Sequence, residues 1–352
     1  MNNIQHINVL VIGAGPAGSV LSYLLHQSGI DCLLVDRASF PREKICGGGL
    51  TPKAWRLLDE LMPGIRYDYH PVRHMRFQFE DGPMCEFESE LEIRMTNRKD
   101  FDYALLQHYL QAGGKLQKEG FAHFEQLPDK RLLVTMKSGL QLTCDYLVAA
   151  DGANSMVRRQ MLGKPKDNMF FMEEYVGKAA PDEVFVHFSR SYAPGCFYKF
   201  SSIGRDIYGF RAPETNRETF SRVLRDFGIP ETRFVGAFIP LNTVRSTVEN
   251  VILIGDAGGF PNKLTGEGLY DAFKTAYNAK CAIVENRSFN DTNRQVFKKM
   301  QREEKVFRFF FSPMGFRLLR FAMRHPRLTK WVFDAKMKRE TFMHRSQWHC
   351  AS

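Results

Sequence analysis

The fold is decided by residues 8–18, which read NVLVIGAGPAG. A short β-branched run is followed by a GxGxxG turn and then by a helical pattern of leucines at Leu21, Leu24 and Leu25. A second apolar run follows and ends at Asp36, about 20 residues beyond the glycines. Strand, glycine turn, helix and terminal acid in this order predict a βαβ unit that binds a dinucleotide.

Each glycine of the turn has a physical task. Gly13 permits the tight turn, Gly15 lets the backbone approach a pyrophosphate, and Gly18 lets the helix pack closely on the strand. The N-terminus of the helix offers free N–H groups and a positive dipole end to the phosphates, and Asp36 is expected to accept hydrogen bonds from the adenosine ribose. The alternative is a glycine-rich turn in an unrelated α/β fold. The predicted dinucleotide contacts are Gly13, Ala14, Gly15, Pro16, Ala17, Gly18, Asp36 and Arg37.

Two later segments bear on the choice between flavin and nicotinamide, which share this fingerprint. Residues 146–155 read YLVAADGANS, and residues 251–269 read VILIGDAGGFPNKLTGEGL. They resemble the DG and GD motifs of the large flavoprotein group that includes aromatic hydroxylases and halogenases. The resemblance implies that Asp256 binds the ribityl chain of FAD. The TGEG segment would open a helix whose N–H groups face the flavin N1–C2=O edge and stabilise the anion of the reduced flavin.

Details of these segments resemble the geranylgeranyl reductase family. The resemblance rests on PREKICGGGL at 41–50, on the composite segment 255–268, and on NRKDFD at 97–102, where Arg98 fits an RxxFD element. Aromatic hydroxylases usually carry His at the position of Gly259 and Gln at that of Glu267, and the WxWxIP signature of halogenases is missing. The resemblance covers about residues 8–285. It adds further cofactor contacts, namely Cys46, Gly47, Gly48, Arg98, Asp151, Gly255, Asp256, Gly266 and Gly268, and it makes Cys46 and Glu267 the candidate catalytic residues.

Cys46 has two interpretations. The family resemblance implies a thiol beside the flavin, where it could position the substrate or assist protonation of the second alkene carbon after hydride transfer from flavin N5. The alternative is a small residue that merely fits a glycine-rich loop.

The substrate side departs from the family. The family carries a segment similar to PGGYGWxFPK, whereas residues 194–202 read PGCFYKFSS, with Lys199 at the position of the Trp. A smaller or more polar substrate is therefore an alternative to a long polyprenyl chain. The predicted substrate pocket consists of Phe197, Tyr198, Lys199 and Tyr208.

Alternating runs such as 75–80 and 183–188 predict antiparallel strands outside the dinucleotide unit. We therefore expect a mixed α/β fold in which a Rossmann-like FAD-binding domain is interleaved with an antiparallel-sheet substrate domain. The predicted FAD-binding domain comprises 1–70, 97–165 and 249–286, the substrate domain 71–96 and 166–248, and a basic, aromatic, helical C-terminal region 287–352.

The net charge of +10 belongs to this C-terminal region, where sixteen Lys or Arg stand against five Asp or Glu. Residues 305–333 alternate basic and large apolar side chains, which suits an anionic membrane surface. The alternative is a helical subdomain that packs on the body of the protein; no nucleic-acid module accompanies the charge. In the membrane interpretation, the lipid-facing side chains are Arg317, Arg320, Arg324, Arg327 and Lys330 with the aromatic residues Phe316, Phe321, Trp331 and Phe333.

Several classes are disfavoured. The seven cysteines are scattered, without a CxxC pair or a metal-ligand cluster, and no apolar stretch of membrane-spanning length is present. From the residues that follow Met1 we expect no signal peptide. We expect a cytoplasmic monomer that has no metal and binds no nucleic acid. In the membrane interpretation of its basic region, it associates with a membrane surface.

The resulting functional hypothesis is an FAD-dependent oxidoreductase that reduces carbon–carbon double bonds of an apolar, isoprenoid or lipid-like substrate. No second GxGxxG unit follows, so NADPH or NADH would dock transiently, or an electron-carrier protein would serve. The alternatives are a flavin-dependent monooxygenase and, outside catalysis, a flavin-binding redox sensor at a membrane surface.

Overall fold

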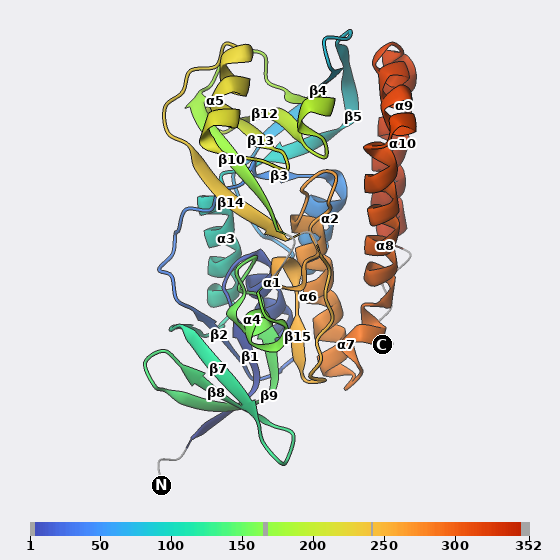
Figure 1. Ribbon diagram of the computed structural model, residues 1–352. Coiled ribbons are helices and arrows are strands. Elements are labelled where there is room, and N and C mark those ends of the chain that lie inside the picture. The colour runs from blue at the N-terminus through green and yellow to red at the C-terminus, as the bar shows by residue number, and fades with distance from the viewer. Residues whose placement is uncertain (1–3, 165–167, 241, 346–352) are drawn as a thin grey trace.

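The computed structural model describes residues 4–164, 168–240 and 242–345, and its strands form two sheets (Figure 1). The first sheet has the order β6-β2-β1-β9-β8-β7, with β15 beside β9. Its strands are β1 (Gln5–Ile12), β2 (Cys32–Asp36), β6 (Leu116–Lys118), β7 (Phe121–Gln126), β8 (Leu132–Met136), β9 (Gln141–Ala149) and β15 (Val251–Leu253). The centre of this sheet is parallel, and β7, β8 and β9 form an antiparallel meander at its edge.

The parallel strands are covered by helices, as expected for a Rossmann-like unit. The helices α1 (Pro16–Gln27), α3 (Arg98–Gln111) and α6 (Leu269–Val284) share one hydrophobic core with β1. Val9 and Val11 of β1 are fully buried against this layer, and Leu10 faces the meander on the other side. This arrangement places the N-terminal ends of α1 and α6 at the same edge of the sheet (Figure 1).

The second sheet has the order β14-β10-β13-β12-β11-β4-β5-β3. Its strands are β3 (Gly49–Leu50), β4 (His70–Phe79), β5 (Cys85–Met95), β10 (Asn168–Gly177), β11 (Val184–Phe188), β12 (Cys196–Ser202), β13 (Arg205–Arg211) and β14 (Val235–Pro240). All neighbours are antiparallel except β4 and β11. The remaining elements of the body are α2 (Pro52–Leu61), α4 (Met156–Leu162), α5 (Arg217–Asp226), α7 (Phe289–Thr292) and the 3₁₀ turns η1 (Arg190–Tyr192) and η2 (Gly255–Gly258). The mixed α/β fold predicted from the sequence is confirmed.

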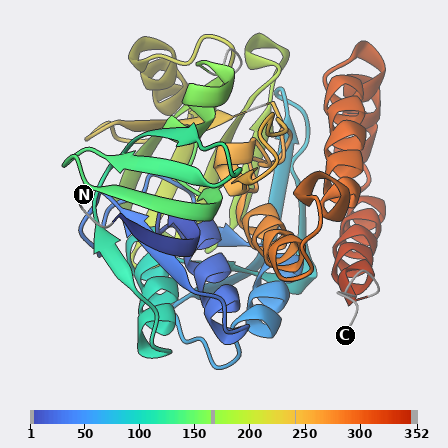
Figure 2. The same ribbon diagram turned by 90° about the horizontal axis from the view of Figure 1, so that it is seen from below.

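The basic C-terminal region forms a helical layer along one side of the molecule (Figures 1 and 2). It consists of α8 (Arg294–Phe310), α9 (Pro313–Met323) and α10 (Pro326–Arg345). Phe316 of α9 stacks on Phe79 of β4, with 5.4 Å between ring centroids. Asp334 of α10 accepts hydrogen bonds from the Ser89 hydroxyl at 2.9 Å and from the Glu90 N–H at 3.1 Å. The region is therefore a helical subdomain packed on the body.

None of the helices within the described residues is both long and apolar enough to cross a membrane.

Candidate flavin site

Three motifs from distant parts of the sequence meet at the N-terminus of α1. Gly13 has φ +106°, and a Cβ there would lie 2.5 Å from the Ala150 carbonyl oxygen, beside the DG motif. A Cβ on Gly255 of the GD motif would lie 3.1 Å from the Cβ of Ala17. The GxGxxG, DG and GD segments therefore form one continuous backbone surface.

The glycine turn leaves a cradle at Gly15. A side chain at Gly18 would collide with the Gly13 carbonyl oxygen at 1.8 Å, so Gly18 serves the fold. A Cβ on Gly15, the N-cap residue of α1, would meet only the Arg42 guanidinium, at 3.5 Å. Open backbone at a helix N-terminus with a cation above it fits the diphosphate of FAD. Sequence reasoning gave Arg42 no role, although it lies in the glycine-rich segment 41–50.

Asp36 is fixed at the end of β2 by two backbone donors. Its Oδ2 accepts from the Ala14 N–H at 2.7 Å, and its Oδ1 accepts from the Ala38 N–H at 2.8 Å. A carboxylate can accept about four hydrogen bonds, so both oxygens retain capacity for ribose hydroxyls. Arg37 is exposed. Ribose binding by Asp36 and cofactor contact by Arg37 stay predictions.

The DG aspartate supports the start of α4. Asp151 accepts from the Met156 N–H at 2.8 Å, and burial raises the pKa of its carboxyl. The GD aspartate, Asp256, sits in η2, and a Cβ on Gly268 would lie 3.3 Å from its Oδ1. Since Gly268 is the N-cap of α6, the structure brings Asp256 to the helix N-terminus that the sequence predicted beside the flavin. Gly266, with φ +73°, makes the turn before it.

Glu267 points into the protein. Its carboxylate lies 2.8 Å from the Lys53 ammonium of α2 and accepts a hydrogen bond from the Thr51 hydroxyl. Burial alone would raise the pKa of Glu267, but Lys53 outweighs it and the pKa lies below its ordinary value. Lys53 is also 2.8 Å from Glu340 of α10. These contacts fix the TGEG segment, and a catalytic role for Glu267 stays a prediction.

The loop of Cys46 is held by a buried ion pair. Arg98 binds Asp102 through two hydrogen bonds, of 2.8 and 3.1 Å, and its side chain also hydrogen-bonds Cys46. The thiol of Cys46 accepts from the Gly48 N–H at 3.5 Å, and Gly48, with φ +75°, lies against the Thr96 carbonyl. Arg98 therefore positions the Cys46 loop; direct contact with a cofactor stays a prediction for Arg98, Gly47 and Gly48.

The predicted substrate residues lie on two faces of the second sheet. Alternation along β12 and β13 places Phe197, Lys199 and Tyr208 on the face covered by α5, where Phe197 stacks on Phe227 at 4.5 Å. Lys199 is paired there with Glu183 at 3.2 Å. The prediction that these three residues share a pocket with Tyr198 is wrong, because neighbouring residues of a strand point to opposite faces.

The opposite face carries Tyr198 and Phe200 and covers the Cys46 loop. Their rings are stacked with 4.5 Å between centroids, and a Cβ on Gly47 would lie 2.4 Å from the Phe200 ring. Two residues that sequence reasoning missed, Glu173 and Tyr175 of β10, share this face. The sequence offered one signal for them: Glu173 and Tyr175 are two residues apart, a spacing that places both side chains on the same face of a strand.

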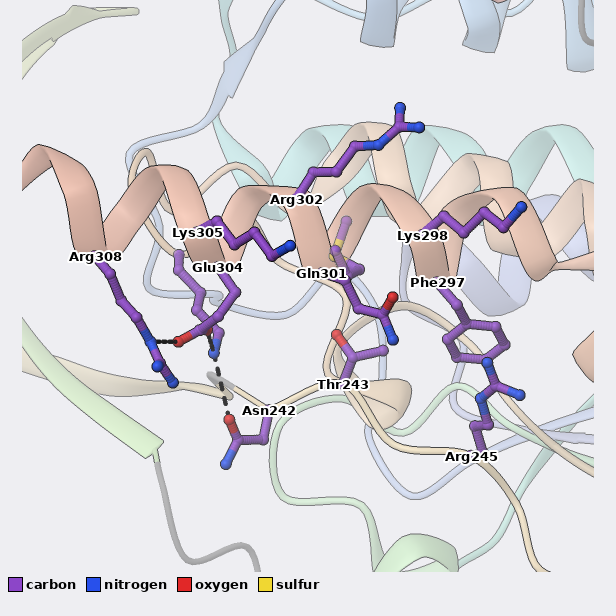
Figure 3. A pocket seen from close by; sticks show the side chains of 12 residues that line it. Asn242, Thr243, Arg245, Phe297, Lys298, Gln301, Arg302, Glu304, Lys305 and Arg308 are labelled. Carbon is purple, nitrogen blue, oxygen red and sulfur yellow. Dashed lines mark hydrogen bonds and ion pairs between the residues drawn. The ribbon is translucent and has the colours of Figure 1, made fainter.

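A separate basic groove lies between α8 and the segment 242–245. Its volume is about 810 Å³. Six cations and one carboxylate line it, namely Arg245, Lys263, Lys298, Arg302, Lys305, Arg308 and Glu304. Figure 3 shows Gln301, Glu304 and Arg308 on the side of α8 that faces Asn242 and Thr243, while Arg302 extends away. The groove adjoins the GD loop, because Thr243 donates a hydrogen bond to the Gly259 carbonyl at 2.8 Å.

Within the described residues, no three His, Cys, Asp or Glu side chains gather in a way that could hold a metal ion. The site is built instead from glycine backbone, helix N-termini and single carboxylates. This combination defines a dinucleotide-binding flavoprotein of the class that carries FAD.

The chain belongs to the family described as FAD binding domain, whose model matches residues 6–184. It is 27% identical over 340 residues to digeranylgeranylglycerophospholipid reductase 1 of Methanopyrus kandleri, covering 88% of each chain. It is 26% identical over 308 residues to geranylgeranyl diphosphate reductase of Rhodobacter capsulatus, covering 79% of this chain and 75% of that protein. The resemblance to geranylgeranyl reductases is confirmed, and the chain is an FAD-dependent oxidoreductase.

Solved structures share the fold. A geranylgeranyl bacteriochlorophyll reductase-like protein from Thermoplasma acidophilum aligns with a TM-score of 0.71 and 18% identity, over 96% of this chain and 92% of that one. A probable FAD-dependent monooxygenase from Pseudomonas aeruginosa aligns with a TM-score of 0.69 and 18% identity, over 94% of this chain and all of that one. The fold is therefore common to both reaction types.

Proposed function

We propose that the chain uses FAD to reduce a carbon–carbon double bond of an apolar, isoprenoid-like substrate. The observation that carries this proposal is the enclosure of the Cys46 loop by the aromatic face of the second sheet, with Phe200 directly over Gly47. An apolar roof beside the cofactor suits a hydrocarbon substrate and excludes water. The names of the relatives, reductases of geranylgeranyl compounds, support the same substrate class.

Bound FAD would supply a hydride to one alkene carbon. The chain's own residues hold and orient it in this proposal: Gly15 and Arg42 bind the diphosphate, Asp36 the adenosine ribose and Asp256 the ribityl chain. The N-terminus of α6, at Gly268, stabilises negative charge near the ring. Cys46, positioned by Arg98, stands beside the reacting carbons.

The test separates reduction from oxygenation. Purified protein is reduced with dithionite without oxygen and mixed with geranylgeranyl diphosphate or menaquinone, the compounds in the names of two relatives. The products are reoxidised, which returns any quinol to the quinone, and are then analysed by mass spectrometry. The expected result is a product heavier by two hydrogens for each reduced double bond. A peroxyflavin absorbance after an oxygen pulse, with oxygen in the product, would establish a monooxygenase instead. Flavin that cycles without converting either probe would favour the redox-sensing alternative.

The basic groove supports NADPH as the electron donor over NADH or an electron-carrier protein, because NADPH carries an additional phosphate on its adenosine ribose. Arg245 is held over the Phe297 ring at 4.4 Å, and Glu304 is shared between Lys263 and Arg308. The four remaining cations of the groove form no ion pair with any described residue, namely Arg245, Lys298, Arg302 and Lys305. Replacing Arg245 with Ala should raise the KM for NADPH more than that for NADH, whereas Arg222→Ala on exposed α5 should change neither.

We further propose that the protein is a cytoplasmic monomer and that its C-terminal layer docks to an anionic membrane. Its exposed apolar side chains are Val306, Phe309, Met314, Leu318, Phe321, Leu328, Trp331, Val332 and Phe342. Its exposed arginines include the predicted Arg317, Arg320, Arg324 and Arg327. The expectation that Phe316, Phe333 and Lys330 face lipid is wrong. Phe316 and Phe333 pack on the body, and Lys330 lies 2.7 Å from Asp334.

A further inference from the structure

A carboxyl group lies inside the second sheet and forms no ion pair with any described residue. Glu173 of β10 is fully buried. Its Oε1 accepts from the Tyr198 hydroxyl at 2.8 Å, and its Oε2 accepts from the Tyr175 hydroxyl at 2.9 Å. The ion pairs between described residues do not include Glu173. Within the part of the chain that the structure describes, both carboxylate oxygens are therefore bound by phenols alone.

A glycine makes the Tyr198–Glu173 contact possible. In the sheet, β13 lies between β12 and β10, and Gly209 of β13 is opposite both Tyr198 and Glu173. A Cβ on Gly209 would lie 1.9 Å from the Tyr198 ring. The missing side chain leaves room for the ring to cross the middle strand and reach the carboxyl group. The geranylgeranyl reductase segment carries glycine at the position of Tyr198, so this pair departs from the family pattern.

Few charges surround the pair. Arg205 of β13 lies over the Tyr175 ring at 4.3 Å. Arg205 and Lys44 act electrostatically on Glu173, and Cys46 acts electrostatically on Tyr198. Burial raises the pKa of Glu173 to about 7, although the two tyrosine hydrogen bonds oppose the shift. Burial also holds the pKa of Tyr198 well above its ordinary value. Near neutral pH, the protonated and ionised forms of Glu173 are therefore both populated, while Tyr198 stays protonated.

The pair faces the enclosure over the Cys46 loop. Tyr198 stacks on Phe200, and Phe200 covers Gly47. Tyr198 thus links the substrate side of the sheet to a buried, titratable carboxyl group.

We propose that Tyr198 donates the proton in the alkene reduction and that Glu173 restores it. This proposal rests on the proposed function, in which reduced flavin supplies the hydride and is oxidised. As the hydride adds to one alkene carbon, the Tyr198 O–H bond breaks and its proton bonds to the other carbon. The electron pair stays on the phenolate oxygen. Glu173 then transfers its carboxyl proton to the phenolate, and solvent protonates Glu173 for the next turnover. Tyr198 is the catalytic residue, and Glu173 acts through it.

The first test needs no substrate. Infrared spectra of the flavin-loaded protein, recorded across neutral pH, should show one protonated carboxyl that titrates near neutrality. The signal should disappear in Glu173→Gln. It should shift to higher pH in Tyr198→Phe, because the carboxylate loses a hydrogen-bond donor. Tyr208→Phe, on the opposite face of the sheet, should leave it unchanged. A Glu173 carboxyl that titrates in the ordinary range would overturn the proposal.

The second test uses geranylgeranyl diphosphate and menaquinone as probes, with dithionite as the reductant. Tyr198→Phe should lower kcat by roughly 100-fold with little change in KM, as expected for loss of a general acid. Glu173→Gln should remove the ionisation near neutral pH from the rate profile. A wild-type protein that reduces a probe while Tyr198→Phe keeps its rate overturns this inference and leaves the proposed function standing. A wild-type protein that reduces neither probe overturns both, and the infrared titration still reports the protonation of Glu173.

Discussion

Lys299 of α8 places its ammonium nitrogen 2.8 Å from both carboxylate oxygens of Asp271 on α6. Asp271 is 1% exposed, so the pair is shielded from water on the carboxylate side. Burial raises the pKa of Asp271, although Lys299 and Lys53 oppose the shift. This ion pair therefore links the C-terminal layer to α6, the helix whose N-terminus faces the proposed flavin.

Replacing Lys299 with Met should destabilise the protein by about 3–5 kcal/mol, because it leaves a buried carboxylate without its partner. Urea unfolding followed by circular dichroism measures the change. Lys298→Met removes an exposed cation from the same helix and should cost less than about 0.5 kcal/mol. Equal stabilities for the two variants would show that the pair does not anchor α8.

The variant Gly15→Val should fold but lose bound flavin. A Cβ at this position meets only Arg42 in the protein, so the clash we expect is with the diphosphate. We expect FAD affinity to fall by at least roughly tenfold, or about 1.4 kcal/mol. Flavin absorbance after gel filtration measures occupancy, and Gly177→Val, at an open position of β10, is the control. Full flavin occupancy in Gly15→Val would refute the phosphate assignment.

Arg42→Gln tests the residue that only the structure revealed. Loss of a charge-assisted contact to the diphosphate should weaken FAD binding by about 1–3 kcal/mol. Because salt screens charge, the difference in FAD-binding free energy between variant and wild type should become smaller at high ionic strength. Fluorescence titration of the apoprotein with FAD at low and high salt gives both values. If the difference in FAD-binding free energy is the same at low and high salt, Arg42 acts through packing alone.

Glu173→Gln should change the pH dependence of stability. The carboxyl has a pKa of about 7 in the folded protein and about 4.3 when unfolded. Stability is thus complete below the unfolded pKa and is lost as pH rises toward the folded pKa, by about 2–4 kcal/mol. The variant lacks this loss, so its melting temperature relative to wild type should rise between acidic and mildly basic pH. Parallel curves for the two proteins would contradict the assignment.

The double variant Leu318→Glu/Trp331→Glu should abolish flotation with anionic liposomes and leave FAD binding intact. Both side chains are more than half exposed on the C-terminal layer, so the change does not disturb the core. Leu140→Glu, on an exposed turn of the first sheet, is the control. Deleting α9 and α10 would be a poorer test, because it would uncover Phe79 and Val72. A wild-type protein that stays at the bottom of the gradient at low salt would rule out the membrane interpretation.

The glycine motifs were predictable because each carries its own local geometry. The positive φ of Gly13 and the contact of Gly18 with the Gly13 carbonyl are both local to the turn. The order of the three motifs along the chain implied that they would meet. The orientation of β12 was not predictable, since Phe197 and Tyr198 are adjacent aromatics and either could face a core. From its residue type alone, Glu173 would be expected on the solvent-exposed surface. Its environment depends on Tyr198 of β12 and on Gly209 of β13, which are distant in the sequence. The role of Arg42 depends on a loop that returns to the glycine turn.

The order of the strands also sets when the protein can acquire its cofactor. β1 pairs with β9, and β9 in turn pairs with β15, whose residues come from the last third of the chain. During synthesis the diphosphate turn emerges early, but Asp256 and α6 reach it only after most of the polypeptide has left the ribosome. In the proposed site, FAD therefore binds late, when most of the chain has been synthesised and folded. Nascent chains arrested before β15 would expose the glycine turn without the half of the site contributed by the GD motif.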